Sequence, residues 1–222
     1  MFADALRAIW LQFPFALIGV RLAIVLLAFT THELAHALTA TALGDPAPRR
    51  QGRLTLNPFV HVESIGAMLA LLAGVGWSRR TIFHPYRMHV PAWLGGTLAA
   101  SAGPLANLGW VLLGLALMRG LNLPPEQPWR NWPGLAEWLS VLVRFNLTMV
   151  LLNLLPLFPL DGFQVVHFLL PQRSMLWWQR ASGWTTALLG IGLFVFMMLP
   201  TSLLVTLAGP PMRWINTALW GP

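Results

Sequence analysis

The sequence predicts an all-α, polytopic membrane protein, and two properties of its composition carry that prediction. Of the 222 residues, 56% are hydrophobic and only 9% are charged, whereas soluble domains carry about 25% charged residues. Apolar runs recur along the chain, and they reach the roughly 18 residues that a helix needs to cross a hydrocarbon core. We therefore expect about four full transmembrane helices, packed as a single domain over residues 1–222 in a lipid bilayer.

The first crossing is expected over residues 15–43, after an amphipathic lead-in over residues 1–14 that lies at the membrane surface. Pro14 separates the two segments, and Gly44 ends the helix. The second half of this crossing contains three polar residues, His32, Glu33 and His36. Polar side chains at that depth are costly, so each of them requires a buried partner.

A polar loop rich in Pro and Gly follows over residues 45–63. Within it, residues 53–56 alternate between polar and apolar side chains, which predicts a short β-strand. Residues 64–77 are apolar but too few for a full crossing, so we expect a re-entrant or core-buried segment there. The basic loop over residues 78–90 leads to the next crossing.

Two further crossings are expected over residues 91–119 and 135–157, and prolines break the second of them near its end. Residues 161–171 then form a short segment, which completes a core over residues 15–171. An additional transmembrane helix is expected over residues 181–208.

The positions of the charged residues predict how these helices are oriented. The formal net charge of +7 comes from fourteen arginines against seven acids, with no lysine. The arginines cluster at the ends of apolar segments, chiefly between residues 45 and 90, so we expect no nucleic-acid partner. Because positive loops face the cytoplasm, the second half of the first crossing should lie on the cytoplasmic side.

The strongest chemical signal is the motif His32–Glu33–Leu34–Ala35–His36. Helical residues at i and i+4 share one face, so the two imidazoles can bind one zinc ion. Glu33 beside them can act as the general base that takes a proton from a metal-activated water. A chance occurrence of the motif would leave three polar side chains without partners in an apolar helix, which is costly. The chain has no cysteine, so its metal ligands must be nitrogen or oxygen atoms.

A catalytic zinc usually has three protein ligands, so a third ligand is required. Of the remaining acids, only Asp161 adjoins a broken apolar helix on the same predicted side as the His pair. Asp161 has an alternative role as the N-cap of the short helix after it, a common position for Asp. These considerations alone leave both roles open.

Three separated motifs resemble those of the site-2 protease family of intramembrane zinc metalloproteases: THELAH at 31–36, AGPLAN at 102–107 and NLLPLFPLDG at 153–162. The loop GRLTLNP at 52–58 is also similar to the family's cytoplasmic loop. The resemblance implies that Glu33 is the catalytic base and that Zn²⁺ is bound by His32, His36 and Asp161. It further implies that Asn107 and Asn153 position the substrate backbone or the oxyanion, although amides in a helical bundle also serve as interhelical hydrogen-bond partners.

The same resemblance implies that the substrates are transmembrane proteins, cleaved within or near their membrane-spanning segments. The protein would lie in an inner (plasma) membrane of bacterial type, with its active site towards the cytoplasm. It would be a minimal member of the family, without a PDZ or nucleotide-sensing domain. Self-association into a homo-oligomer is left open.

The chain departs from the family pattern at two places. His61–Val62–Glu63–Ser64 replaces the usual Asp-Pro after the loop His, and Phe163 replaces the second Gly after Asp-Gly, where it can narrow the access path. The loop histidines are expected to be exposed or to pack within their loops: His61, His84 and His89. A competing hypothesis is a non-proteolytic membrane zinc-binding protein or carrier. Glu33 discriminates between the two, because a carrier needs no general base.

Overall fold

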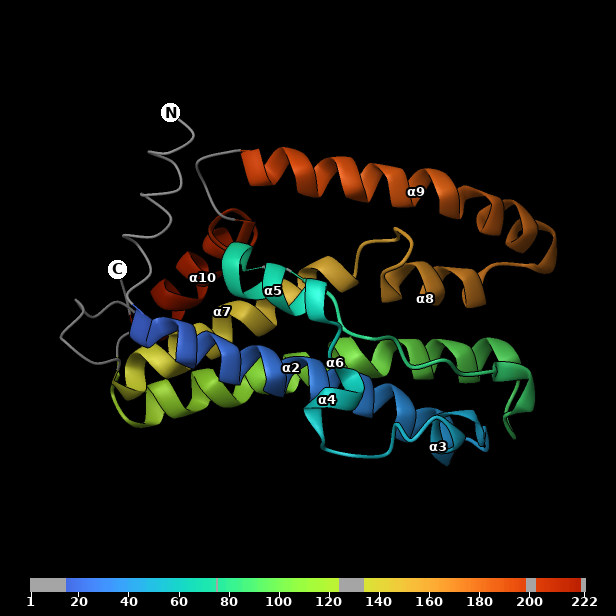
Figure 1. Cartoon of the computed structure of the whole chain (residues 1–222), viewed down its shortest axis with the longest axis horizontal. Helices are drawn as coiled ribbons and strands as arrows, with labels where there is room; N and C mark the ends of the chain where they lie inside the picture. The colour runs from blue at the N-terminus through green and yellow to red at the C-terminus, as the bar shows by residue number, and fades with distance from the viewer. Residues whose placement is uncertain (1–14, 75, 124–133, 199–202, 221–222) are drawn as a thin grey trace.

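The computed structural model describes residues 15–74, 76–123, 134–198 and 203–220, and within these ranges the chain is helical without a β-strand. Three long helices form the central bundle (Figure 1): α2 (Phe15–Ala42), α6 (Ala92–Gly120) and α7 (Leu135–Asn153). Each contains a segment long and apolar enough to cross a membrane: Ile18–Ala42, Ala92–Gly120 and Leu135–Asn153. The first three predicted crossings are thus confirmed as helices of that kind. The lead-in predicted over residues 1–14 lies outside the described residues.

Small residues allow the three long helices to approach closely. On α6, a Cβ added at Gly114 would lie 2.5 Å from the side chain of Val143 on α7, and one at Gly96 would lie 2.4 Å from the ring of Phe168. Close backbone approach of this kind is how helices pack where lipid removes the hydrophobic drive between them. Between α2 and α7, the rings of Phe29 and Phe145 pack with their centroids 6.0 Å apart.

Four short elements lie between α2 and α6: α3 (Ala47–Arg50), α4 (Pro58–His61), α5 (Ser64–Ala73) and η1 (Pro85–Arg87). The ten residues of α5 span about 15 Å, roughly half of a hydrocarbon core. The short apolar segment predicted over residues 64–77 is therefore a half-length helix, and it packs against α2. Glu63 caps it by accepting a hydrogen bond from the Gly66 amide at 2.7 Å.

The β-strand predicted over residues 53–56 is not confirmed, because these residues form bends and coil. Their alternation has a different cause: Arg53 is only 7% exposed, and its guanidinium group donates hydrogen bonds to backbone carbonyls rather than facing water. Among the described residues, strand-like pairing in this region is limited to one isolated antiparallel bridge between Val62 and Ser78.

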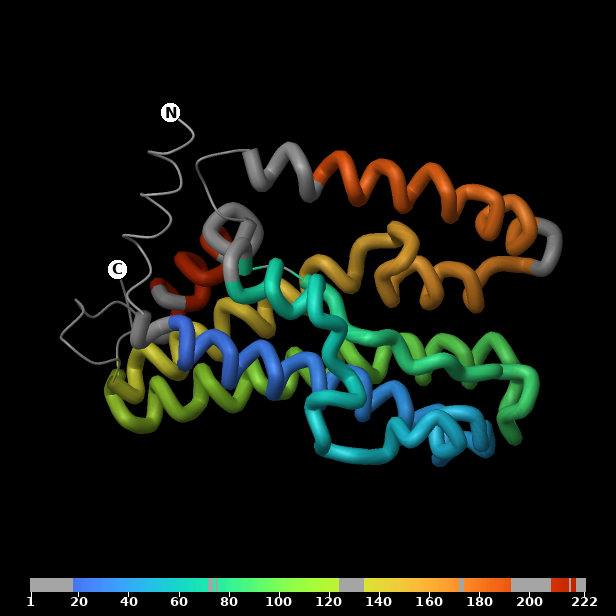
Figure 2. The backbone as a smooth tube through the Cα atoms, in the orientation of Figure 1, coloured from blue at the N-terminus to red at the C-terminus, as the bar shows by residue number. Residues whose placement is uncertain are grey.

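The last three helices are α8 (Asp161–Leu169), α9 (Gln172–Met198) and α10 (Leu203–Trp220). The tube in Figure 2 runs from α7 through a turn into α8, then reverses into α9. α8 contacts α6 as well as α9, and α10 contacts α7. The helix predicted over residues 181–208 is not confirmed: that range includes the end of α9 and the start of α10, and residues 199–202 lie outside the described residues.

Candidate metal centre

Three residues from distant parts of the sequence meet in the interior. His32 and His36 come from α2 and Asp161 from the start of α8, and at most 5% of each is exposed. The two Nε2 atoms are 3.2 Å apart, and the Oδ2 atom of Asp161 lies 3.1 Å from His32 Nε2 and 3.3 Å from His36 Nε2. Within the described ranges, this is the one group of His, Asp or Glu side chains that could hold a metal ion.

Local structure explains why these side chains converge. His32 and His36 are one helical turn apart on α2, so both imidazoles project from the same face. Asp161 is the first residue of α8, and the N-cap position before it is occupied by Leu160 in an extended conformation. The alternative role of Asp161 as the N-cap is therefore wrong, and its carboxylate faces the imidazole pair instead.

Gly103 on α6 leaves space for the imidazole pair. A Cβ at this position would lie 2.3 Å from His36 Nε2 and 2.6 Å from His32 Cε1. Both distances are far below the roughly 3.5–4.0 Å of ordinary carbon contacts. Any residue other than Gly would therefore push α6 away from the site or displace the two rings.

The hydrogen-bond partners of the two imidazoles indicate where their protons lie. His36 Nδ1 is 2.6 Å from the carbonyl oxygen of Ala99, and a carbonyl only accepts, so Nδ1 must carry the hydrogen. His32 Nδ1 is 2.7 Å from the side-chain oxygen of Asn107 and donates in the same way. In the neutral form of each ring, Nε2 then presents a lone pair towards the carboxylate oxygen of Asp161. That oxygen is buried and accepts no hydrogen bond in the described structure.

Three electron-rich atoms that face one another in this way repel unless a proton or a metal ion lies between them. Zinc binds imidazole nitrogen and carboxylate oxygen at about 2.0–2.2 Å, so two ligands of a tetrahedral site lie roughly 3.3–3.6 Å apart. The observed separations of 3.1–3.3 Å are close to that edge length. Both histidines also donate their second nitrogen to an oxygen, as metal-bound histidines almost always do. The residues present fit a zinc ion.

Glu33 lies beside the imidazole pair and is held by an extended segment, residues 76–84, which we call the strap. The Ser78 hydroxyl donates to one carboxylate oxygen of Glu33 at 2.6 Å, and the Thr81 amide donates to the other at 2.6 Å. Thr81 also bonds the Glu33 carbonyl through its hydroxyl, at 3.2 Å. Only 2% of Glu33 is exposed. Both oxygens of the predicted base are thus engaged by the protein.

Residues of the preceding loop hold the strap in place. Arg53 donates to the carbonyl oxygens of Arg79 at 2.9 Å and Arg80 at 3.3 Å, and burial lowers the pKa of its guanidinium group. The side-chain amide of Gln51 pairs with the backbone of Ile82 through two hydrogen bonds, of 2.7 and 3.2 Å. The strap could not be predicted from the sequence, because a basic loop carries no signal for a contact with a helix residue 45 positions away.

The two predicted substrate-binding asparagines have different surroundings. Asn107 on α6 is fully buried, and its side chain bonds His32 on one side and Asn146 of α7 on the other. Its side chain lies in the interior of the bundle. Asn153 is the last residue of α7 and is 8% exposed, and its amide donates to the carbonyl oxygen of Met149 at 3.0 Å. Asn146 was not predicted as a site residue.

The histidines of the loop differ from one another. His61 is fully buried and bonds the Thr55 carbonyl oxygen at 2.8 Å, so of the two expected environments it has the second, packing within its own loop. Its imidazole does not belong to the group that could hold a metal. His84 and His89 are exposed, as predicted.

Phe163, the departure from the family pattern after Asp161, is 5% exposed. Its ring stacks on Trp178 of α9 with centroids 4.9 Å apart, and the Trp178 indole donates to the Phe163 carbonyl oxygen at 3.1 Å. Phe163 also lines a cavity of about 250 Å³, which is bounded by α8, α9 and the strap residue Arg80. Instead of glycine, the chain thus has an aromatic anchor for α9 next to the metal centre.

Proteins with similar sequences are named as zinc metalloproteases, which agrees with a zinc-binding site formed by His32, His36 and Asp161. The chain is 37% identical over 165 residues to a Bacillus subtilis protein named "Putative zinc metalloprotease YwhC", and the match covers 73% of this chain and 74% of that relative. The chain belongs to the site-2 protease family.

Two mycobacterial members of the site-2 protease family match over a smaller share of their length. Proteins named "Putative zinc metalloprotease Rip2" are 31% identical in Mycolicibacterium smegmatis and 33% identical in Mycobacterium tuberculosis strain Erdman. These matches cover 72% and 69% of this chain, and 60% of each relative. No family model matches the chain, and no solved structure matches it significantly.

Proposed function

We propose that this chain is an intramembrane zinc metalloprotease that hydrolyses peptide bonds within or next to the transmembrane segments of membrane proteins. One observation carries the proposal: two imidazole nitrogens and one carboxylate oxygen lie within 3.3 Å of one another, directly beside the carboxylate-bearing residue Glu33. The names of the relatives as zinc metalloproteases support the same activity.

In this proposal His32, His36 and Asp161 are the zinc ligands, and Glu33 is the general base. A bound zinc ion supplies a Lewis acid that activates water and polarises the scissile carbonyl. Glu33 takes the proton from the attacking water and passes it to the leaving amine. The burial of all four side chains keeps bulk water away from these steps and strengthens their electrostatic interactions.

In this proposal the strap leaves Glu33 during catalysis. Ser78 and Thr81 each donate to one carboxylate oxygen of Glu33 and so hold the base on the strap, and these hydrogen bonds must break before the carboxylate can move with the attacking water. A substrate must also enter as an unwound chain, because helical hydrogen bonds occupy its carbonyls. We propose that entry of the substrate displaces the strap, and that Asn153 then contacts the substrate backbone.

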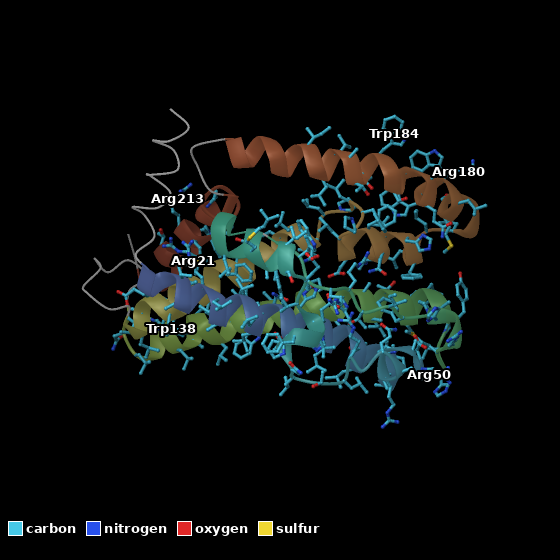
Figure 3. The ribbon with its side chains drawn as sticks, viewed as in Figure 1. Arg21, Arg50, Trp138, Arg180, Trp184 and Arg213 are labelled. Carbon is cyan, nitrogen blue, oxygen red and sulfur yellow. The ribbon has the colours of Figure 1, made fainter. Side chains whose placement is uncertain are left out.

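The proposed arrangement in the membrane is a single domain over residues 1–222 with four crossings, the fourth over residues 181–208. Arg50 and Arg180 lie towards one end of the molecule, and Arg21 and Arg213 towards the other (Figure 3). The segment between α2 and α6, which contains α3 and η1, carries six arginines. By the positive-inside rule, we assign the side of the membrane on which this segment lies to the cytoplasm of a bacterial-type inner membrane.

A second function is favoured by the engagement of Glu33. A protein that binds zinc without cutting peptides needs no free base, and both oxygens of this carboxylate are occupied. The Glu33→Gln variant separates the two functions. In a protease it abolishes cleavage and leaves the metal bound, whereas in a zinc-binding protein or carrier it leaves the function intact.

The test uses the full chain in detergent or liposomes, with zinc content measured by mass spectrometry and cleavage measured on a model transmembrane substrate. The protease function predicts about one zinc per chain and cleavage for the wild type, zinc without cleavage for Glu33→Gln, and neither for Asp161→Ala. Cleavage that persists in Glu33→Gln would refute the role of this residue. Zinc without cleavage of any substrate in the wild type would favour the non-proteolytic function.

A further inference from the structure

A chain of three hydrogen bonds runs from α7 through α6 to the metal centre on α2. The side-chain amide of Asn146 donates to the Leu142 carbonyl oxygen at 2.9 Å, that of Asn107 donates to the Asn146 side-chain oxygen at 3.0 Å, and His32 Nδ1 lies 2.7 Å from the Asn107 oxygen. We propose that Asn146 is a positioning residue, which orients Asn107 and thereby makes His32 present the lone pair of its Nε2 atom to zinc.

The Leu142 carbonyl sets the direction of the whole chain. A backbone carbonyl can only accept, so the NH₂ group of Asn146 must point towards it, and the oxygen of Asn146 must point towards Asn107. The NH₂ group of Asn107 then faces Asn146, which leaves the oxygen of Asn107 for His32. His32 Nδ1 must therefore donate, and its Nε2 atom has no hydrogen in the neutral ring.

The opposite orientation of Asn107 would disable the site. Its NH₂ group would face His32 Nδ1, which would have to accept, and the ring hydrogen would move to Nε2. That hydrogen would point at His36 Nε2 and the Asp161 carboxylate, which lie 3.2 and 3.1 Å away, and would fill the space that a metal requires. Because Asn107 and Asn146 are both fully buried, no bulk water can satisfy a misdirected amide.

Interhelical packing alone does not explain this arrangement. Thr148 on the same helix is 1% exposed and bonds the carbonyl four residues before it, at 2.9 Å, as Asn146 does. No side chain of α6 bonds Thr148 in the described structure, whereas the Asn146 oxygen accepts from Asn107. Thr148 is thus a matched case of a buried polar residue that has only the local contact.

The experiment measures the zinc dissociation constant of the full chain in detergent by competition with a chromophoric chelator. Removing a hydrogen-bond partner of a metal-bound histidine typically weakens metal binding by about 10–100-fold. We expect Asn146→Leu to weaken zinc binding by about tenfold and the control Thr148→Val to change it by less than about twofold. Asn146→Leu with the same affinity as the wild type would overturn the proposal.

A second pair of variants separates orientation from packing. In Asn107→Asp, both oxygens of the carboxylate accept, so no misdirected orientation exists and His32 Nδ1 still donates, but the second oxygen faces the oxygen of Asn146 without a donor between them. Adding Asn146→Leu to this variant removes that pair of acceptors, so it should produce no further tenfold loss of zinc affinity. A loss of equal size in both backgrounds would mean that Asn146 acts through packing, and would overturn the proposal.

A further variant decides the matter if Asn146→Leu fails to fold, which the thermal unfolding of the metal-free protein reports. In Asn146→Asp the fully buried carboxyl group is neutral, so its O–H donates to the Leu142 carbonyl oxygen and its other oxygen accepts from the Asn107 amide; zinc affinity should therefore stay within about threefold of the wild type. A tenfold loss in Asn146→Asp would overturn the proposal. The inference rests on the zinc site of the proposed function but not on proteolysis, so a chain that binds zinc without cleaving substrates still tests it.

Discussion

Replacing Gly103 with alanine should weaken zinc binding strongly although no ligand is changed. A Cβ at this position would lie 2.3 Å from His36 Nε2 and 2.6 Å from His32 Cε1. To restore an ordinary contact, α6 and the imidazole pair would have to move apart by about 1 Å. Zinc sites tolerate deviations of about 0.2 Å in ligand distance, so the displacement is roughly five times the tolerance.

The effect on stability should be much smaller than the effect on zinc. Alanine is more favourable than glycine in a helix by about 0.5–1 kcal/mol, whereas overpacking a buried site costs about 1–3 kcal/mol. The two contributions oppose each other, so we expect the free energy of unfolding to fall by roughly 0–2.5 kcal/mol. Zinc affinity should fall by about 100-fold or more, at or beyond the upper end of the losses seen when only a supporting residue is changed.

Isothermal titration with zinc, together with thermal unfolding of the metal-free protein, measures both quantities. Gly109→Ala is the matched control, because Gly109 lies on the same helix and a Cβ there would meet no atom within 4 Å. This control should bind zinc like the wild type and be slightly more stable. Wild-type zinc affinity in Gly103→Ala would refute the close approach of α6 to the imidazole pair.

Three further predictions concern the strap and α5. Ser78→Ala removes one donor to Glu33. Because a hydrogen bond to a charged group contributes about 1.5–3 kcal/mol and about 1.4 kcal/mol corresponds to tenfold, cleavage of a model transmembrane substrate should accelerate by up to about 150-fold; a slower rate would mean that the strap positions the base instead of blocking it. Arg53→Ala leaves buried carbonyls without a donor and should lower the free energy of unfolding by about 1–3 kcal/mol. The control Arg50→Ala, at an exposed position, should lower it by less than about 0.5 kcal/mol. Equal melting temperatures for the two variants would contradict this prediction. The Gly66 amide donates to the Glu63 carboxylate and holds the pKa of this carboxyl below its usual range, so the ionised group stabilises the fold above its unfolded pKa and this stabilisation is lost as pH falls through the folded pKa. The melting temperature of Glu63→Ala should therefore be lower than that of the wild type at pH 7 and equal to it in strong acid. A difference in melting temperature that does not depend on pH would argue against this role.

Hydrophobicity and short motifs predicted the parts of the structure that depend on local sequence. Apolar length located the three long helices, and helical spacing placed His32 and His36 on one face. The residues alone left Asp161 undecided between a cap and a ligand. The resemblance to the family favoured the ligand, and the position of Leu160 as the N-cap is consistent with it.

Contacts between distant segments could not be predicted in this way. The alternation at residues 53–56 has the period of a strand, but the Arg53 side chain points inward because it donates hydrogen bonds to carbonyl oxygens of the strap. No local sequence pattern predicts that contact. No local pattern predicts the hydrogen bonds from Ser78 and Thr81 to Glu33 or the one from Asn107 to Asn146 either. Each of these contacts joins two segments whose side chains have no periodic relation to each other, so only the packed structure brings them together.

X-ray absorption at the zinc edge, recorded on the zinc-loaded full chain, tests the central claim most directly. We expect one zinc per chain with two imidazole nitrogens and at least one carboxylate oxygen at about 2.0–2.2 Å, and loss of the oxygen ligand or of the metal in Asp161→Ala. A spectrum with fewer than two imidazoles, or one that is unchanged by Asp161→Ala, would contradict the site formed by α2 and α8.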